Sequence, residues 1–261
     1  MILLSTNMYT NENFEEVFYF VEKYPQIGLE LFPLWNTSEY GPLMERYKER
    51  LSQIPISFHE QYYESEHAVD ERDRRYAHTM EMTEKTLSLA KELSSKYMVY
   101  HYNNMKVLPE RREHMLETAR RNLRKVNEQA KEAGVEVVIE NVGVASHNNV
   151  MLNEREFIEE CLAMPNQVLI DVGHAWCNGW DLEHVIAALK EKIVAYHIHN
   201  NNGKEDEHQR IHSGTLNFDA FMKMYAKYTP SADLVLEYAP NVKDDVAGIQ
   251  ADIEELLVKG V

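Results

Sequence analysis

The stretch from Val168 to Asp181 reads Val-Leu-Ile-Asp-Val-Gly-His-Ala-Trp-Cys-Asn-Gly-Trp-Asp. Its apolar start is typical of a buried strand that ends at the carboxylate of Asp171, after which Gly173 turns the chain toward the imidazole of His174. Asp181 stands where the N-cap of the next helix is expected. The stretch therefore predicts a strand end that presents an oxygen ligand and a nitrogen ligand just before a helix. Taken alone, it fits equally well a loop in which Asp171 caps a turn and His174 is solvated.

A short apolar run followed by a helical pattern occurs eight times along the chain. The strands are predicted at Ile2–Thr6, Ile27–Phe32, Ile54–His59, Tyr97–Tyr102, Val135–Glu140, Val168–Asp171, Ile193–His199 and Leu234–Tyr238. The clearest helix follows Pro109 and closes at Gly134, and Asn153, Asp181 and Asn217 are the expected N-caps of later helices. Strands that alternate with helices favour parallel pairing through crossover helices.

Eight such units in a chain of 261 residues match a single-domain α/β fold, a (β/α)8 TIM barrel over residues 1–261. A doubly wound open sheet is the alternative. It is disfavoured because the segment after the first strand, Ser5–Tyr9, contains no glycine of a phosphate-binding fingerprint.

The composition, with 44% hydrophobic and 27% charged residues, is that of an ordinary globular protein. The segment Met1–Asn7 has no basic region, and no apolar window is long enough to span a membrane, so we expect a cytoplasmic protein with no membrane partner. The cysteines, Cys161 and Cys177, make no disulfide framework. The net charge of −16 disfavours non-specific binding to nucleic acid. The expected partner is a small molecule, and a homo-oligomer stays open.

Carboxylates and imidazoles stand at the ends of most of the predicted strands. They are Glu30, His59, His101, Glu140, Asp171, His197, His199 and Glu237. In a TIM barrel these C-terminal strand ends carry the chemistry. Because strand side chains alternate with period two, Glu140 shares a face with Val138, and Glu237 shares a face with Val235. The sequence therefore predicts a ring of carboxylates above an apolar barrel interior.

Carboxylates and imidazoles gathered this closely would repel one another and desolvate at great cost, which a divalent metal relieves by binding them. The strand ends thus predict metal ligands at His59, His101, His197, Glu140, Asp171 and Glu237. In the next loop, Asp206 and His208 form an Asp-x-His pair that could fold back onto this site, and a solvated charged loop is the alternative. Arg210 is the candidate for binding an anionic group or a hydroxyl, and Tyr62 and Tyr63 are candidates to wall a pocket.

The chain resembles the xylose isomerase-like barrel superfamily, which holds sugar isomerases and epimerases together with endonuclease IV. The resemblance rests on Ile139-Glu140-Asn141, Asp171-Val-Gly-His174-Ala, Gly179-x-Asp181, His197, Asp206-x-His208, Gly214 and Glu237. It implies that residues like Glu140, Asp171, His197 and Glu237 hold one divalent metal ion, commonly manganese. It also implies that the two glutamates exchange the substrate proton and that His174 contacts substrate.

In endonuclease IV a larger ligand set holds three zinc ions. The resemblance maps that set onto His59, His101, Glu140, Asp171, His174, His197, Asp206, His208 and Glu237. The loops after the first two strands, 7–12 and 33–40, lack the glycines and basic residues that enter DNA in endonuclease IV. His199-Asn200 and His212 also depart from its pattern. The resemblance therefore implies a kept metal site and a lost DNA-reading surface.

We therefore predict a divalent-metal-dependent sugar or sugar-phosphate isomerase/epimerase that transfers a proton through an enediolate, with Glu140 and Glu237 as acid and base. The cofactor is Mn²⁺ or Zn²⁺, one ion or as many as three. The expected substrate contacts are His174, Arg210, Glu30 and His199. The alternatives are an endonuclease IV-like zinc phosphodiesterase acting on abasic DNA and a metal-dependent lyase or dehydratase acting on a cyclic polyol. A non-catalytic binding module is disfavoured by the intact pair of glutamates.

Overall fold

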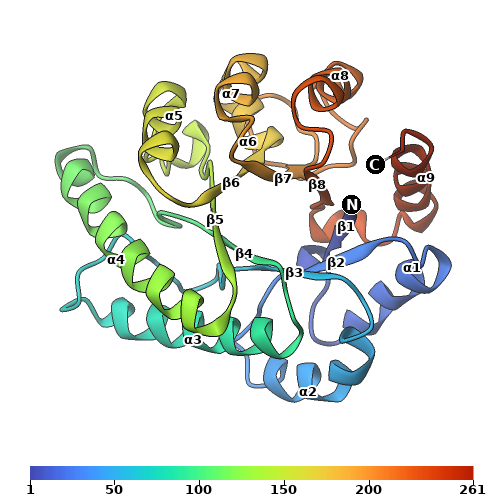
Figure 1. The fold of residues 1–261 in the computed structure, drawn as a ribbon, viewed down its shortest axis with the longest axis horizontal. Coiled ribbons are helices and arrows are strands. Elements are labelled where there is room, and N and C mark those ends of the chain that lie inside the picture. The colour runs from blue at the N-terminus through green and yellow to red at the C-terminus, as the bar shows by residue number, and fades with distance from the viewer. Residues whose placement is uncertain (261) are drawn as a thin grey trace.

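The computed structural model describes residues 1–260 and forms one closed, parallel eight-stranded barrel in which the strands follow one another in sequence order (Figure 1). The strands are β1 (Ile2–Ser5), β2 (Gly28–Leu31), β3 (Ile56–His59), β4 (Tyr97–Tyr100), β5 (Glu136–Glu140), β6 (Gln167–Asp171), β7 (Ile193–Ile198) and β8 (Asp233–Leu236). The predicted TIM barrel is confirmed and the open sheet is excluded, because β1 pairs with β8 and closes the ring.

Helices surround the strands (Figure 1). They are α1 (Phe18–Lys23), α2 (Tyr40–Leu51), α3 (Arg74–Glu92), α4 (Arg112–Ala133), α5 (Glu154–Ala163), α6 (Val172–Cys177), α7 (Leu182–Leu189), α8 (Phe218–Tyr228) and α9 (Val246–Val258). Short 3₁₀ turns lie at Thr6–Met8, Phe14–Val17, Pro109–Arg111, Ala145–His147 and Pro240–Val242. In the described residues, none of the helices has the length and apolar character that crossing a membrane requires.

Local sequence signals account for where several of these helices begin and end. Asn153, Asp181 and Asn217 each accept a backbone N–H of the following turn, as predicted for N-caps. Helix α4 ends at Gly134, whose φ of 74° is the left-handed conformation that glycine adopts without steric cost.

The prediction for the segment after β6 needs a correction. Residues 172–177 form the short helix α6 rather than a loop, and Asp171 is its N-cap.

The barrel interior is a solid apolar plug. Its side chains come from alternate positions of six strands and are Leu3, Tyr97, Val99, Val138, Leu169, Ala195 and Val235. All of them are buried. Because strand side chains alternate, the residues two positions further on, such as Glu140, Asp171 and His197, stand on top of this plug. The predicted ring of polar groups above an apolar interior is therefore the arrangement in the structure.

Candidate metal centre

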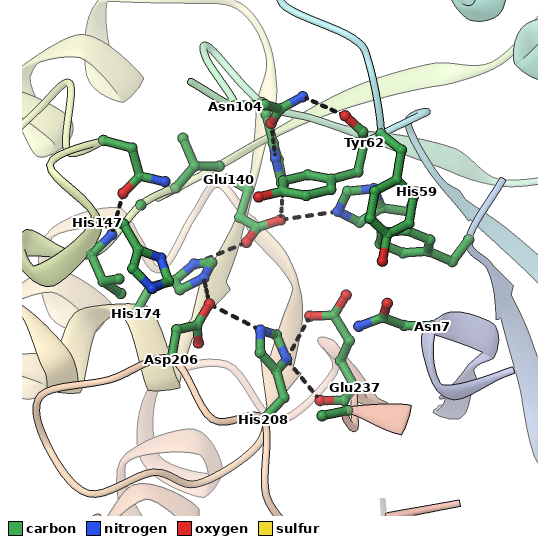
Figure 2. A pocket seen from close by; sticks show the side chains of 18 of the residues that line it. Asn7, His59, Tyr62, Asn104, Glu140, His147, His174, Asp206, His208 and Glu237 are labelled. Carbon is green, nitrogen blue, oxygen red and sulfur yellow. Dashed lines mark hydrogen bonds and ion pairs between the residues drawn. The ribbon is translucent and has the colours of Figure 1, made fainter. Parts of the chain in front are cut away.

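The polar groups at the C-terminal ends of the strands converge on one pocket (Figure 2). The pocket has a volume of about 220 Å³. Its titratable lining residues are His59, His101, Glu140, His147, His174, Asp206, His208 and Glu237, together with the phenols Tyr62 and Tyr63. These residues come from several strand ends and loops, so the barrel closure is what brings them together.

Glu140, the last residue of β5, is the most connected carboxylate of the centre. Its Oε2 atom lies 2.9 Å from His101 Nε2 and 3.3 Å from His197 Nδ1. Its Oε1 atom lies 3.3 Å from His174 Nδ1, and His59 Nε2 approaches Oε2 to 3.9 Å. Glu140 therefore stands between separate groups of imidazoles and could serve more than one ion.

His197 lies at the meeting point of the two glutamates. Its Nδ1 atom is 3.3 Å from Glu140 Oε2 and also 3.3 Å from Glu237 Oε2, with Asp171 Oδ2 at 3.8 Å. The opposite nitrogen, Nε2, lies 3.0 Å from Glu30 Oε1. A carboxylate on the outer nitrogen of an imidazole is the usual way in which a protein orients a metal-binding histidine. Glu30 thus fixes His197 so that Nδ1 faces the centre.

A second group of ligand-type side chains lies beside the first. Asp206 Oδ2 is 3.1 Å from both His174 Nε2 and His208 Nε2, so the loop after β7 does fold back onto the pocket. His208 Nδ1 in turn lies 3.5 Å from Glu237 Oε2. The Asp-x-His pair predicted from the sequence is therefore part of the site and not a solvated loop.

The arrangement passes a chemical test for a divalent metal. The ligand-type atoms within each of the sets His59/His101/Glu140, His174/Asp206/His208, Glu30/His197/Glu237 and Glu140/Asp171/His174 lie within 4.8 Å of one another. Within the described part of the chain, His197 Nδ1 and Asp206 Oδ1 are buried and have no hydrogen-bond partner. Buried polar atoms normally have partners, and carboxylate oxygens and neutral imidazoles are ligands of divalent metals. These residues fit a metal site.

The electrostatic state of the bare site shows how strongly these groups depend on one another. Burial alone would raise the pKa of Glu140, but the imidazoles of His101 and His197 hold it well below its ordinary value. Burial opposes the charged form of His208, yet Asp206 raises the pKa of that imidazole to about 10. His59, which is buried beside His101, has its pKa lowered to about 4. The bare protein therefore keeps its charges only as mutually paired groups.

Three residues hold Asp171 in place. Its carboxylate accepts the backbone N–H of His174 at 2.6 Å and lies 3.0–3.1 Å from His199 Nε2. The side-chain amide of Asn141 binds the backbone of Asp171 on both sides. Its Oδ1 atom accepts the Asp171 N–H, and its Nδ2 atom donates to the Asp171 carbonyl oxygen. Gly173 is required here, because a Cβ at this position would lie 2.0 Å from His199 Cε1.

Replacing Gly173 by alanine is therefore expected to displace His199 from Asp171. We expect a loss of about 1–3 kcal/mol in the free energy of unfolding, from overpacking, and metal affinity about 10–100-fold weaker. Chemical denaturation and metal titration measure the two effects. The control is Gly41→Ala, whose added Cβ makes only an ordinary 3.7 Å contact with Trp35. Equal behaviour of the two variants would contradict the role given to Gly173.

The predicted substrate contacts divide into one that lines the pocket and three that do not. His174 lines it. Glu30 and His199 are buried, at 0% and 1% exposure. Glu30 is hydrogen-bonded to His197, and His199 is hydrogen-bonded to Asp171. Arg210 points to α9, where its guanidinium donates to Asp252 in two hydrogen bonds of 2.8 Å. Of the four predicted substrate contacts, the structure therefore brings only His174 to the pocket, and the side chains of Glu30, His199 and Arg210 each contact a neighbouring protein group instead.

Arg210 is expected to stabilise the fold and not to bind substrate. Asp252 has a side chain that is only 2% exposed, and it also accepts from Tyr238 Oη at 2.8 Å. Arg210→Met leaves this buried carboxylate with one partner, at an expected cost of about 3 kcal/mol in the free energy of unfolding. The KM of the catalysed reaction should not change. A raised KM with unchanged stability would instead restore Arg210 as a substrate contact, and Arg155→Met, in an exposed pair with Glu159, is the control.

The sequence does not predict the buried pair formed by Glu60 and His67, which lies next to His101. Glu60 Oε2 lies 2.8 Å from His67 Nε2, and Glu60 Oε1 accepts from Asn104 Nδ2 at 3.2 Å. Asn104 Oδ1 in turn lies 2.8 Å from His101 Nδ1, which leaves Nε2 of that ring toward Glu140. Glu60 follows directly after the predicted third strand, so its position was a usable signal. His67 had no such signal in the sequence, because it lies in the irregular loop 60–73 between β3 and α3.

A closed eight-stranded barrel with carboxylates and imidazoles gathered at the C-terminal strand ends defines a class of TIM-barrel protein with a metal-type centre. Residues 12–257 match the family described as xylose isomerase-like TIM barrel. The chain belongs to that family.

Known proteins resemble the chain at low sequence identity. An uncharacterized protein of Methanocaldococcus jannaschii is 28% identical over 188 residues, which is 71% of each chain. A solved D-tagatose 3-epimerase-like protein superposes with a TM-score of 0.78 at 18% identity, covering 100% of this chain and 99% of the other. The IOLI protein with a bound zinc atom gives 0.75 at 15% identity, with the same coverage. An AP endonuclease of family 2 from Brucella melitensis gives 0.69 at 15% identity, covering 92% and 93%. At these identities the superpositions show a shared fold.

Proposed function

We propose that the protein is a divalent-metal-dependent sugar isomerase or epimerase that moves a proton at a carbon next to a carbonyl. The observation that carries the proposal is that Glu140 and Glu237 both approach His197 Nδ1 to 3.3 Å at the base of a pocket. Glu140 ends strand β5 and Glu237 directly follows strand β8, and these two strands are not neighbours in the barrel. Two such groups can act on two faces of one substrate carbon, as epimerisation or aldose–ketose exchange requires.

In this mechanism Glu140, Asp171, His197 and Glu237 would hold the metal ion. When bound, the ion, Mn²⁺ or Zn²⁺, would supply Lewis-acid stabilisation of the negative charge that develops on substrate oxygens. One glutamate takes the substrate proton and the other returns a proton. Both are buried, at 2% and 3% exposure, so a bound sugar would exclude water from them. His174 lines the pocket beside Glu140 and is placed to bind a substrate hydroxyl.

The family resemblance and the names of similar structures support a carbohydrate substrate. The D-tagatose 3-epimerase-like protein shares the fold over the full chain, and a zinc atom is bound in the IOLI structure. A lyase or dehydratase acting on a cyclic polyol would use the same metal and carboxylates, and product analysis would separate it from an isomerase.

A second candidate function is a zinc phosphodiesterase acting on abasic DNA. Two further sets of ligand-type side chains, His59/His101/Glu140 and His174/Asp206/His208, favour it, because they could hold ions in addition to the proposed catalytic one. The AP endonuclease among the similar structures points the same way. Against it, segments 7–12 and 33–40 at the C-terminal end of the barrel contain no lysine or arginine to hold phosphates.

Metal content and two assays test these functions. We expect purified protein to carry close to one divalent ion per chain by mass spectrometry. We also expect it to interconvert members of a panel of ketoses and leave an abasic oligonucleotide intact. About three zinc ions per chain together with incision of the oligonucleotide would replace the sugar chemistry with the second candidate function.

A further inference from the structure

We propose that a second pocket beside the metal centre is a subsite for the far end of the substrate, a unit with an apolar face that carries an anionic group. The proposal rests on the proposed function in one respect: the other end of the substrate is taken to be a sugar bound at Glu140 and Glu237. The substrate would then be a sugar joined to an anionic second unit, not a free monosaccharide.

The two pockets adjoin one another. The second has a volume of about 770 Å³ and lies where the loops after β3 and β4 meet the first turns of α3 and α4. Tyr62, Asn104, His147 and Asn149 line both pockets. The metal-side pocket, at about 220 Å³, lies below the range of about 300–1,000 Å³ that is usual for whole ligands. A ligand that fills a usual volume would therefore extend past Tyr62 and Asn104 into the second pocket.

Of the two pockets, only the second is lined by lysine and arginine side chains. The residues that line the metal-side pocket include no lysine or arginine, whereas Arg72, Arg75, Lys106 and Arg111 line the second one. Of these, Arg75 is paired with Asp73. Arg72, Lys106 and Arg111 have no carboxylate within 4.0 Å anywhere in residues 1–260. An anionic group on the ligand would therefore be received here, away from the carboxylates of the metal centre.

The acidic residues of the second pocket form no ion pair with Arg72, Lys106 or Arg111 and have other partners. Glu66 accepts the backbone N–H groups of Ala68, Asn104 and Met105. Asp70 pairs with His114 and Arg121 on α4. The lining of this pocket has one more lysine or arginine than aspartate or glutamate, in a chain whose net charge is −16.

Exposed apolar side chains lie at the same place. Met105 and Leu108, which are 46% and 43% exposed, line the second pocket together with the buried Met115. Tyr63, at 44% exposure, lines the adjoining metal-side pocket. Contiguous exposed apolar surface is a feature of ligand-binding grooves. The apolar residues would contact the body of the second unit while Arg72, Lys106 and Arg111 receive its charge.

Phenyl phosphate, which combines an apolar ring with a phosphate, is the probe for this subsite. We expect calorimetric titration to show saturable binding that survives chelation of the metal, because none of the proposed metal ligands belongs to the second pocket. Lys106→Ala and Arg111→Ala should each weaken binding about tenfold or more, the effect of losing one hydrogen bond to a charged group. The control is Arg124→Ala, an exposed arginine of helix α4 that lies outside the pocket, and it should bind as the wild type does.

Three results would overturn the subsite. They are absence of saturable binding, equal affinity of the Arg111→Ala and Arg124→Ala proteins, and an abasic duplex oligonucleotide that binds tightly and loses affinity in the same variants. The last result would assign the cations to a nucleic-acid path. Phenyl phosphate binding that is lost in Lys106→Ala and Arg111→Ala, in a protein that turns over no ketose, would support the subsite and contradict the sugar chemistry.

Discussion

Replacing Glu140 by glutamine is expected to lower kcat about a thousandfold, because the substitution removes both a proton-transfer group and a metal ligand. The side chain keeps its size but loses the charge that His101, His174 and His197 face at 2.9–3.3 Å. Steady-state kinetics with a converted ketose measure the loss of turnover. Metal analysis of the same preparation shows how much of that loss is lost metal.

The matched control is Glu136→Gln. Glu136 begins the same strand β5, is exposed, and lies at the opposite end of the barrel from the pocket. This variant should keep the activity and metal content of the wild type. If the Glu140→Gln protein retained its activity within a few-fold, the proton-transfer role given to Glu140 would be wrong.

Removal of the metal is expected to abolish turnover and to lower the melting temperature by about 5–10 °C. A ligand held at about a hundred times its Kd contributes about 2.7 kcal/mol of stability, and each kcal/mol moves Tm by about 2–4 °C in a chain of this size. The physical reason is that the bare site leaves His197 Nδ1 and Asp206 Oδ1 buried without hydrogen-bond partners in the described structure. Calorimetry before and after chelation, and after Mn²⁺ or Zn²⁺ is returned, measures both effects.

The Asp206→Asn protein separates the ligand sets in the same experiment. Asp206 belongs to the His174/Asp206/His208 set and not to the four residues proposed to hold the catalytic ion. We expect this variant to keep most of the metal-dependent rise in Tm. Loss of the whole rise would show that the main ion lies between His174 and His208, and an unchanged Tm in chelated wild-type protein would contradict a resident metal.

The fold could be predicted because its signals are local and repeated. Several strands, such as β3, β5 and β6, are short apolar runs that end in a polar residue, and several helices have a cap that the sequence shows, as at Asn153 and Gly134. Period-two alternation also fixed which side of β5 carries Glu140, because Val138 on the same side had to fill the barrel. The stretch after Asp171 was less predictable. A capped helix and a turn begin with the same residues, and Gly173 is there for packing against His199.

The finer roles of the site residues depend on contacts between segments far apart in the sequence. Glu30 and His197 are 167 positions apart, so their hydrogen bond has no local signal. Arg210 follows a ligand loop closely, yet its partner Asp252 lies 42 positions later, on α9. The sequence therefore identifies the chemical types that gather at the strand ends. Only the three-dimensional structure distinguishes residues that face the pocket from residues that hold them in place.

Deuterium uptake tests the central claim most directly, namely that Glu140 and Glu237 transfer a proton next to a carbonyl. Metal-loaded protein would be incubated in D₂O with each member of a ketose panel, and the sugars examined by NMR and mass spectrometry. We expect solvent deuterium to appear at a carbon adjacent to the carbonyl of at least one sugar, and not with the Glu140→Gln protein. Exchange that proceeds equally well with Glu140→Gln, or its absence from the whole panel while abasic DNA is cleaved, would contradict the account.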